Sequence, residues 1–323
     1  MSGPIEEFLR ELDTQTHQSP ERREILRGLV TRIVELAQLD ADTADLRIAS
    51  TALNELLEAS ALFAAWRDKA KVTVFGSART KPDDPLYEMA RAFGAASAAR
   101  GWMTVSGAGP GIMEASSKGS GKDNTLGVNI ELPFEQGANE FIDVDEMHVA
   151  MKFFFTRKVA MTRASHAFVA FPGGVGTMDE LFEILTLVHT GKTDPAPIVL
   201  VETPDGTFWE RWCHFVDVLV HDGYIDALDT CLFRVCTSVV SAMEEIEHFY
   251  RNYRSLQVEP GRARIALHRV PNATQCEELA ARFPVFSSAR GFRVEDNQLT
   301  FDFDGRNYVR LRLLIDALND LAG

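Results

Sequence analysis

The residues with the clearest capacity for chemistry lie in the segment Phe171–Glu180, which reads Phe-Pro-Gly-Gly-Val-Gly-Thr-Met-Asp-Glu. A short apolar run precedes it and apolar residues at helical spacing follow it, so we predict a strand, a glycine turn and a helix start. Gly173, Gly174 and Gly176 lack Cβ atoms, so backbone N–H groups can converge on one point at the positive end of the helix dipole. This arrangement suits an anionic ligand such as a phosphate.

The same residues have a purely structural interpretation. Thr177 and Glu180 have the spacing of a capping box, in which both side chains satisfy free N–H groups at the start of a helix. On that interpretation the glycines only form a tight turn, and the rest of the chain has to decide between the two.

Charged residues close to this motif favour a catalytic or ligand-binding site over a purely structural turn. Arg157 and Lys158 lie in a predicted helix that is otherwise rich in apolar residues, and the planar guanidinium of Arg157 could clamp a phosphate or ribose edge. Glu180 and Glu183 lie one helical turn apart and share a face. A carboxylate beside a bound sugar can stabilise an oxocarbenium-like transition state or orient water at the anomeric carbon. The alternative for Arg157 is an ordinary surface ion pair.

Alternating strands and helices position these residues. Their pattern predicts an α/β fold, a Rossmann-like doubly wound parallel sheet whose ligand lies where the strand order reverses. In the order 3-2-1-4-5, Gly76 and Ser77 after the first strand meet the 172–177 turn after the fourth, beside the glycine turn of 106–111. The five predicted strands are 72–75, 102–105, 126–132, 167–170 and 198–201, with a helix over 151–163 before the fourth.

Two further parts flank this domain. We predict a helical N-terminal extension over 1–69, with a first turn around Ile5 and Leu12 and a helix that starts at Ser19 and Pro20. The Rossmann-like domain spans 70–254. A small α+β unit spans 258–323, with a hairpin turn near Asp296.

Composition narrows the partners. The net charge of −14 argues against nucleic acid and anionic membranes as partners, without excluding a local phosphate pocket. The four cysteines show no paired or metal-like spacing, which predicts reduced thiols in a cytoplasmic protein without a bound metal. No run of apolar residues is long enough to span a bilayer, and the N-terminus lacks the features of a signal peptide.

Other glycine motifs fit the sequence less well. Gly107, Gly109 and Gly111 have the spacing G-x-G-x-G after the second strand, whereas the dinucleotide fingerprint is G-x-G-x-x-G after the first, although Glu131 lies where a ribose-binding acid is expected. Neither a P-loop nor the G-x-S-x-G elbow of hydrolases is present.

Taken together, the Arg157-Lys158 pair and the PGGVGTMDE segment resemble the RK and PGGxGTxxE motifs of the LONELY GUY family, the cytokinin riboside 5′-monophosphate phosphoribohydrolases. The loops at Phe75–Arg79 and Gly107–Glu114 resemble two earlier loops of that family, and the likeness covers roughly 70–250. Bacterial relatives are often labelled lysine decarboxylases, but no residues here suggest a pyridoxal-phosphate lysine site. The second loop departs from the family by reading Ser-Gly-Ala-Gly where many members have a run of glycines.

The resemblance implies hydrolysis of the N-glycosidic bond of a nucleoside 5′-monophosphate, with AMP or an N6-modified AMP as substrate, no cofactor, and a homodimer or larger assembly. It makes Arg157 and Glu180 the catalytic residues. It further implies a set of substrate-binding positions in the matched motifs, namely Gly76, Ser77, Gly107, Gly109, Lys158, Gly173, Gly174, Gly176 and Thr177. The alternative is a non-catalytic binder of a phosphorylated cofactor, like a molybdopterin carrier, on the same fold.

Overall fold

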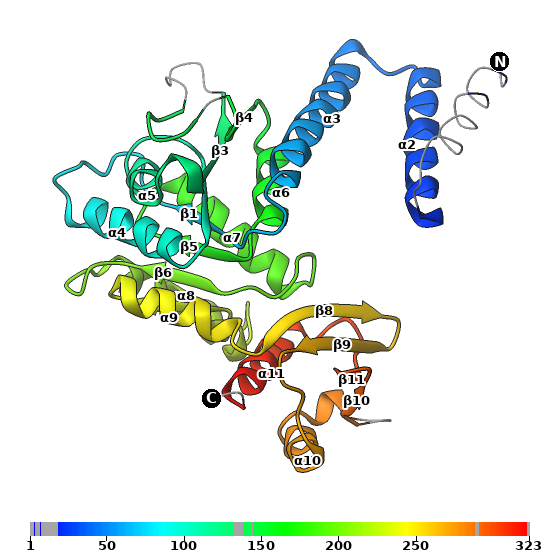
Figure 1. The fold of residues 1–323 in the computed structure, drawn as a ribbon, viewed down its shortest axis with the longest axis vertical. Coiled ribbons are helices and arrows are strands. Elements are labelled where there is room, and N and C mark those ends of the chain that lie inside the picture. The colour runs from blue at the N-terminus through cyan, green and yellow to red at the C-terminus, as the bar shows by residue number, and fades with distance from the viewer. Residues whose placement is uncertain are drawn as a thin grey trace. The chain divides into compact units, whose positions relative to one another are not determined.

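The computed structural model describes residues 3, 7, 19–131, 138–143, 145–287 and 291–321. The chain forms two compact units, residues 1–54 and residues 55–323 (Figure 1). Within the described parts, no helix has the length and apolar character needed to cross a membrane.

The first unit contains α2 (Pro20–Gln38) and the beginning of α3 (Thr43–Ala64). The helix start at Ser19 is confirmed, because Ser19 is the N-cap and its hydroxyl accepts a hydrogen bond from the Arg22 N–H at 3.3 Å. The turn predicted around Ile5 and Leu12 lies outside the described residues. From Glu55 onward, α3 belongs to the second unit.

A sheet of seven parallel strands forms the centre of the second unit, in the order β4-β3-β2-β1-β5-β6-β7. The predicted order is confirmed, since the five predicted strands are β3, β2, β1, β5 and β6, and the order reverses between β1 and β5. The strands are β1 (Lys71–Phe75), β2 (Met103–Ser106), β3 (Thr125–Ile130), β4 (His148–Met151), β5 (Ala167–Ala170), β6 (Ile198–Val201) and β7 (Phe233–Cys236).

The two edge strands were not predicted. Strand β4 pairs with β3, and its side chains are alternately half-buried and buried, as expected at the edge of a sheet. The helix predicted from residue 151 is therefore wrong at its start, because Met151 is the last residue of β4 and α6 begins at Phe154.

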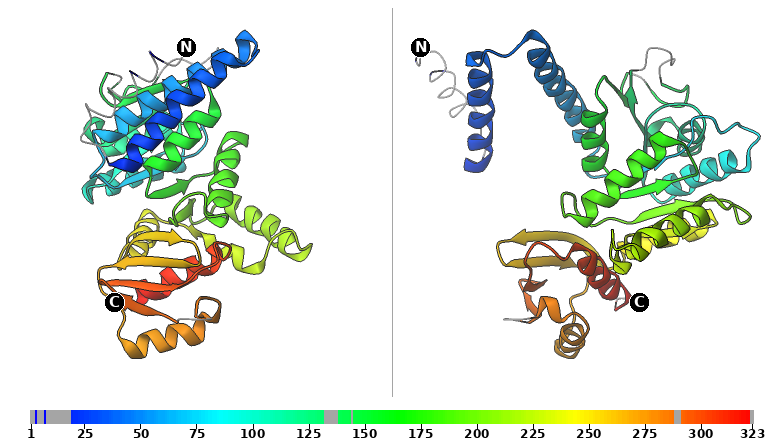
Figure 2. Two further views of the ribbon diagram at one scale, coloured as in Figure 1. Left: turned by 90° about the vertical axis from the view of Figure 1, so that its right-hand side faces the viewer. Right: turned by 180° about the vertical axis from the view of Figure 1, so that it is seen from behind.

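Helices cover both faces of the sheet, which makes the domain doubly wound (Figures 1 and 2). One face packs against α4 (Pro85–Ala99), α5 (Ile112–Ser120) and α9 (Val239–Phe249). The other packs against the end of α3, α6 (Phe154–Ala164), α7 (Val175–His189) and α8 (Phe208–His221). Short 3-10 turns, η1 (Lys122–Asn124) and η2 (Ala227–Leu232), precede β3 and β7.

The last part of the chain forms a four-stranded antiparallel sheet in the order β10-β11-β9-β8. The predicted hairpin is present, with Asp296 and Asn297 at positive φ in its turn, whereas β8 was not predicted. Tyr253, the first residue of β8, lies in this second core. Its elements are β8 (Tyr253–Glu259), β9 (Arg262–Leu267), α10 (Ala273–Arg282), η3 (Pro284–Phe286), β10 (Arg293–Glu295), β11 (Gln298–Asp302) and α11 (Tyr308–Asp320).

Helix α11 ties this sheet to the Rossmann-like domain. Buried Arg312 donates hydrogen bonds of 2.9 Å to Glu245 of α9 and to Asp316 one turn along its own helix. The side-chain carbonyl of Asn319 accepts the backbone N–H groups of Asn252 and Tyr253 at 3.0 and 2.9 Å. These buried polar contacts hold the α9–β8 connection against α11. The predicted domain boundaries stay a prediction.

Candidate active site

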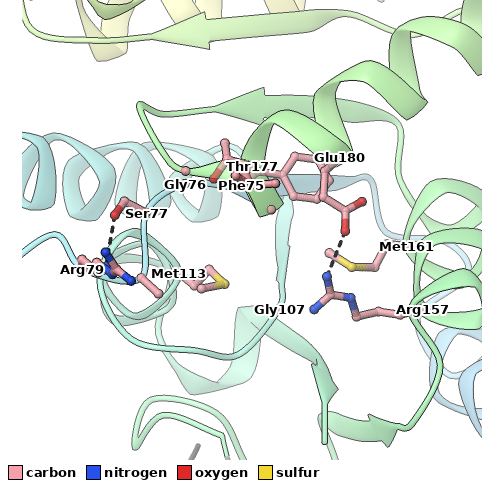
Figure 3. Close-up of a pocket in the computed structure, with 14 residues that line it drawn as sticks. Phe75, Gly76, Ser77, Arg79, Gly107, Met113, Arg157, Met161, Thr177 and Glu180 are labelled. Atoms are coloured by element: carbon pink, nitrogen blue, oxygen red, sulfur yellow. Dashed lines mark hydrogen bonds and ion pairs between the residues drawn. The ribbon is translucent and has the colours of Figure 1, made fainter. Parts of the chain in front are cut away.

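The carboxyl ends of β1, β2 and β5 border a cavity of about 520 Å³ (Figure 3). It lies at the point where the strand order reverses, as expected for a doubly wound sheet. The loops after β1 and β5 are joined there by the Ser77 N–H, which donates to the Pro172 carbonyl at 3.2 Å. The predicted site residues among those that line the cavity are Gly76, Ser77, Gly107, Arg157, Gly174, Gly176, Thr177 and Glu180.

Helix α7 presents an open N-terminus to this cavity. It begins at Val175 with Gly174 as its N-cap, and among the described residues no side chain caps it. The capping-box interpretation is therefore wrong, because Thr177 is already the third helical residue and Glu180 is bound elsewhere. The first N–H groups of a helix have no partner within the helix, and those of α7 belong to residues that line the cavity. The helix start is thus available to an anion.

Close approach explains the need for Gly173 next to this helix start. A Cβ atom at Gly173 would lie 2.1 Å from the Thr177 hydroxyl oxygen and 2.6 Å from its Cβ. Gly173 does not itself line the cavity. Its contribution is to let the turn pack directly on Thr177, which does line it.

In the wall of the cavity, Arg157 of α6 and Glu180 of α7 form an ion pair of 2.9 Å (Figure 3). Their side chains are only 14% and 7% exposed, so the pair is held in a largely water-excluded wall. The guanidinium also lies over the Phe154 ring, 5.0 Å from its centroid, and the buried Arg157 Nε has no hydrogen-bond partner in the part of the chain that the structure describes. A pair packed this way can hold both charged groups in fixed positions beside a ligand.

Opposing effects set the protonation of Glu180. Burial raises the pKa of its carboxyl, and the nearby Arg157 and Lys158 cations lower it. The pKa remains above its ordinary value of 4.5. Oxygen Oε1 accepts a hydrogen bond from Arg157, whereas within the described structure Oε2 has only the more distant Lys158 ammonium at 4.0 Å. Among the described residues, one oxygen of this desolvated carboxyl therefore makes no hydrogen bond at the cavity wall.

Lys158 does not fit the predicted role of a phosphate ligand. Its ammonium lies 2.8 Å from Asp179 and 2.5 Å from Glu183, and Lys158 is not among the residues that line the cavity. Consecutive residues of a helix point in different directions, so Lys158 faces α7 while Arg157 faces the cavity. Lys158 therefore ties α6 to α7 behind Glu180.

The second glycine loop also differs from expectation in detail. Gly107 lines the cavity, but Gly109 does not. A Cβ at Gly109 would lie 2.8 Å from the terminal methyl group of Met113, so this glycine makes room for a side chain that does line it. Between them, buried Ala108 adopts φ 61°, a left-handed conformation that glycine adopts more easily. The alanine thus occupies a glycine-like backbone position.

Glu55 is a positioning residue that the sequence analysis missed. Its carboxylate is 3% exposed and accepts the Lys152 N–H at 2.7 Å and the Thr156 hydroxyl. It thereby fixes the start of α6, directly before Arg157. The only sequence signal is an acidic residue between Leu53 and Leu56 on the apolar stripe of a predicted helix.

Within the residues described, no group of three or more His, Cys, Asp or Glu side chains is arranged to hold a metal ion.

Comparison with known proteins gives relatives for this arrangement. The family described as "Possible lysine decarboxylase" matches residues 100–246. A Mycobacterium marinum protein named cytokinin riboside 5′-monophosphate phosphoribohydrolase is 34% identical over 143 residues, 43% of this chain and 69% of that protein. A Mycobacterium tuberculosis protein of the same name is 33% identical over 150 residues, 43% of this chain and 74% of that protein.

Among solved structures, the molybdenum cofactor carrier protein of Chlamydomonas reinhardtii has a TM-score of 0.41 and 21% identity, covering 55% of this chain and 96% of the carrier. The sequence relatives decide the assignment, because the likeness to the two mycobacterial proteins spans most of their length. The chain therefore belongs to the LONELY GUY family, whose named members here are cytokinin riboside 5′-monophosphate phosphoribohydrolases.

Proposed function

We propose that this protein hydrolyses the N-glycosidic bond of a nucleoside 5′-monophosphate and releases the free base and ribose 5-phosphate. The observation that carries the proposal is the buried Arg157–Glu180 pair of 2.9 Å in the wall of a cavity that also contains an uncapped helix start. An anion site and a desolvated carboxyl in one cavity are the two features that this reaction needs.

The phosphate binds at the start of α7 in this proposal. Backbone N–H groups of Gly176 and Thr177, with the helix dipole behind them, supply hydrogen bonds and positive potential. Ser77 lies on the neighbouring loop and its hydroxyl completes the cradle. Fixing the 5′-phosphate holds the ribose in place, so that its anomeric carbon lies toward Glu180.

Glu180 acts in its ionised form. As the bond from C1′ to the base nitrogen breaks, positive charge develops on the ribose, and the free Oε2 of Glu180 stabilises it or positions the attacking water. Arg157 orients Glu180 and the substrate. Water adds to C1′, one proton of that water leaves, and the base departs with the bonding electron pair and takes up a proton.

The substrate preference follows from the lining and the relatives. Phe75, Met113 and Met161 supply apolar surface in the same cavity, which suits the flat face of a purine. The relatives named above carry the name of enzymes that act on cytokinin riboside 5′-monophosphates. AMP and N6-modified AMP are therefore the substrates to test first.

The test is chromatography of AMP and isopentenyladenosine monophosphate after incubation with the purified protein, with adenosine alongside. Free base should appear from both monophosphates and not from adenosine, which lacks the phosphate. Glu180→Gln should abolish turnover and leave the fold unchanged. Glu88→Gln is the matched control, because it makes the same chemical change in an exposed ion pair with Arg91 on α4.

The alternative function makes a different prediction. A carrier of a phosphorylated cofactor would bind its ligand stoichiometrically without consuming it, and it would need the glycine loops but not Glu180. AMP that binds without release of base would favour the carrier. Full turnover by Glu180→Gln would refute the catalytic role of that residue.

A further inference from the structure

A second polar cavity lies at the amino-terminal ends of β5 and β6, at the other end of the parallel strands from the candidate active site. Its volume is about 650 Å³, and its lining includes His166, directly before β5, and Ala196, shortly before β6. The first residue of β8, Tyr253, closes it from the C-terminal sheet. Since the candidate active site lies beyond the carboxyl ends of the strands, the two cavities are at opposite ends of β5.

Three cations line this second cavity without an ion pair among the described residues. They are Arg163 near the end of α6, Lys192 after α7 and Arg254 in β8, and all three are exposed. His166 adds a hydrogen-bond donor, because its Nδ1 accepts the Lys71 N–H at 3.2 Å and the neutral ring then carries its proton on Nε2. In a chain with a net charge of −14, unpaired cations converging from three separate segments attract an anion.

Unpartnered hydroxyl groups on two buried residues line the same cavity. Tyr253 is 3% exposed and Thr162 is 7% exposed, and in the described part of the chain neither hydroxyl makes a hydrogen bond. The two hydroxyl oxygens are themselves accessible from the cavity although the residues that carry them are buried, so each can donate a hydrogen bond to water or to a ligand there. The neighbouring Tyr250 differs, because its hydroxyl is already used by the His166 carbonyl at 2.6 Å.

Besides these cations and hydroxyl groups, one carboxylate among the described residues lines the cavity. Asp194 lines the cavity and makes no ion pair within the described residues. A carboxylate is a hydrogen-bond acceptor, which a phosphate cannot satisfy but a sugar hydroxyl can. The adjoining cavity of about 510 Å³ shares Arg163 and His166 and adds Arg67, so the positive surface continues beyond one phosphate.

We propose that this cavity is a second ligand site, which binds a phosphorylated sugar, either free or as part of a nucleotide. The phosphate contacts Lys192, Arg254 and Arg163, which suit it as charged donors. The sugar hydroxyls contact Asp194 and the Tyr253 hydroxyl. The volume is in the range of small-molecule sites, and this site does not depend on the proposed hydrolysis.

The test uses ribose 5-phosphate, AMP and inorganic phosphate as probes in calorimetric titrations of the full chain. All titrations use the Glu180→Gln background, so that AMP is not consumed. A Lys192→Glu and Arg254→Glu double variant should weaken binding of ribose 5-phosphate or AMP at one class of site by about tenfold for each removed charge. The matched control is Lys122→Glu with Arg211→Glu, two exposed cations outside both cavities that change the net charge equally.

A second variant guards against a change in folding. Tyr253→Phe removes one unpartnered hydroxyl and keeps the buried ring, so it should preserve the fold and weaken only the sugar-bearing probes. Inorganic phosphate that binds as tightly as the sugar phosphates would refute the sugar part of the proposal. Equal affinities in the double variant, the control and the parent would refute the site itself. Both outcomes are independent of turnover, which is measured separately in proteins that retain Glu180.

Discussion

Removing the carboxylate of Glu55 tests how the candidate active site is built. Glu55 is 3% exposed and accepts hydrogen bonds from the Lys152 N–H and the Thr156 hydroxyl at the start of α6. Arg157 is the next residue along. If these two hydrogen bonds hold Arg157 in place, Glu55→Ala should impair both the stability of the chain and its turnover of AMP.

The size of the expected loss in stability follows from these two hydrogen bonds. A hydrogen bond to a charged group contributes about 1.5–3 kcal/mol, and a buried donor left without a partner costs about 1–3 kcal/mol. Thr156 keeps a second partner, the Phe153 carbonyl at 2.8 Å, so the loss centres on the Lys152 N–H. We expect Glu55→Ala to lower the free energy of unfolding by about 3 kcal/mol. Glu55→Gln keeps one acceptor oxygen, so we expect its free energy of unfolding to fall by about half as much as that of Glu55→Ala.

Urea unfolding measures the stability, and steady-state release of base from AMP measures kcat and KM. A displacement of Arg157 by about 1 Å is expected to lower kcat/KM about 100-fold, far more than the unfolded fraction explains. Glu244→Ala on the exposed face of α9 is the control. The reasoning fails if Glu55→Ala is destabilised and its folded fraction turns over AMP at the parental rate.

Three other expectations concern neighbouring features. Gly173→Ala should lower the melting temperature and the affinity for AMP, because the new Cβ would lie 2.1 Å from the Thr177 hydroxyl; equal melting curves would contradict this. The raised pKa of Glu180 means that the folded chain holds this proton more tightly than the unfolded chain, so its stabilising effect is complete below pH 4.5 and is lost as the pH rises through the folded pKa. Activity that needs the ionised form rises over the same window, and Lys158→Met should move the acid limb of kcat/KM to higher pH, whereas a lower or unchanged limb would refute the assignment. Arg312→Ala removes the ion-pair partner of Glu245 and leaves Asp316 with only Arg234 at 3.8 Å, so it should cost about 3 kcal/mol in urea unfolding, with an unchanged midpoint as the contrary result.

The central strands of the parallel sheet, which alternate with helices along the chain, could be predicted from the sequence. Apolar runs that alternate with helical segments predicted β1, β2, β3, β5 and β6, and their order followed from the connection rules for parallel strands. The edge strands escaped prediction because neither is buried throughout, as β2, β5 and β6 are: β4 alternates half-buried and buried residues, and only the first and last residues of β7 are buried. Edge strands depend on a neighbour that the local sequence does not reveal.

The site was predictable where backbone conformation decides it. Glycine turns placed Gly76, Gly107 and Gly174 at one cavity, since strand order alone brings those loops together. The direction of individual side chains was not predictable in the same way. Lys158 faces Asp179 and Glu183 across a helix pair, and this depends on how α6 packs against α7. The roles assigned to these residues, the domain boundaries and the assembly into oligomers stay predictions.

The open first turn of α7 has a consequence for how occupancy can be observed. Its amide hydrogens have no side-chain cap in the described structure, so in the free protein those of Gly176 and Thr177 should exchange rapidly with solvent deuterium. A bound anion completes the helix start and should slow that exchange. A ligand at a hundred times its dissociation constant also adds about 2.7 kcal/mol to the stability of the fold. Deuterium uptake at one helix turn would therefore rank candidate ligands in a chain whose catalysis has been removed.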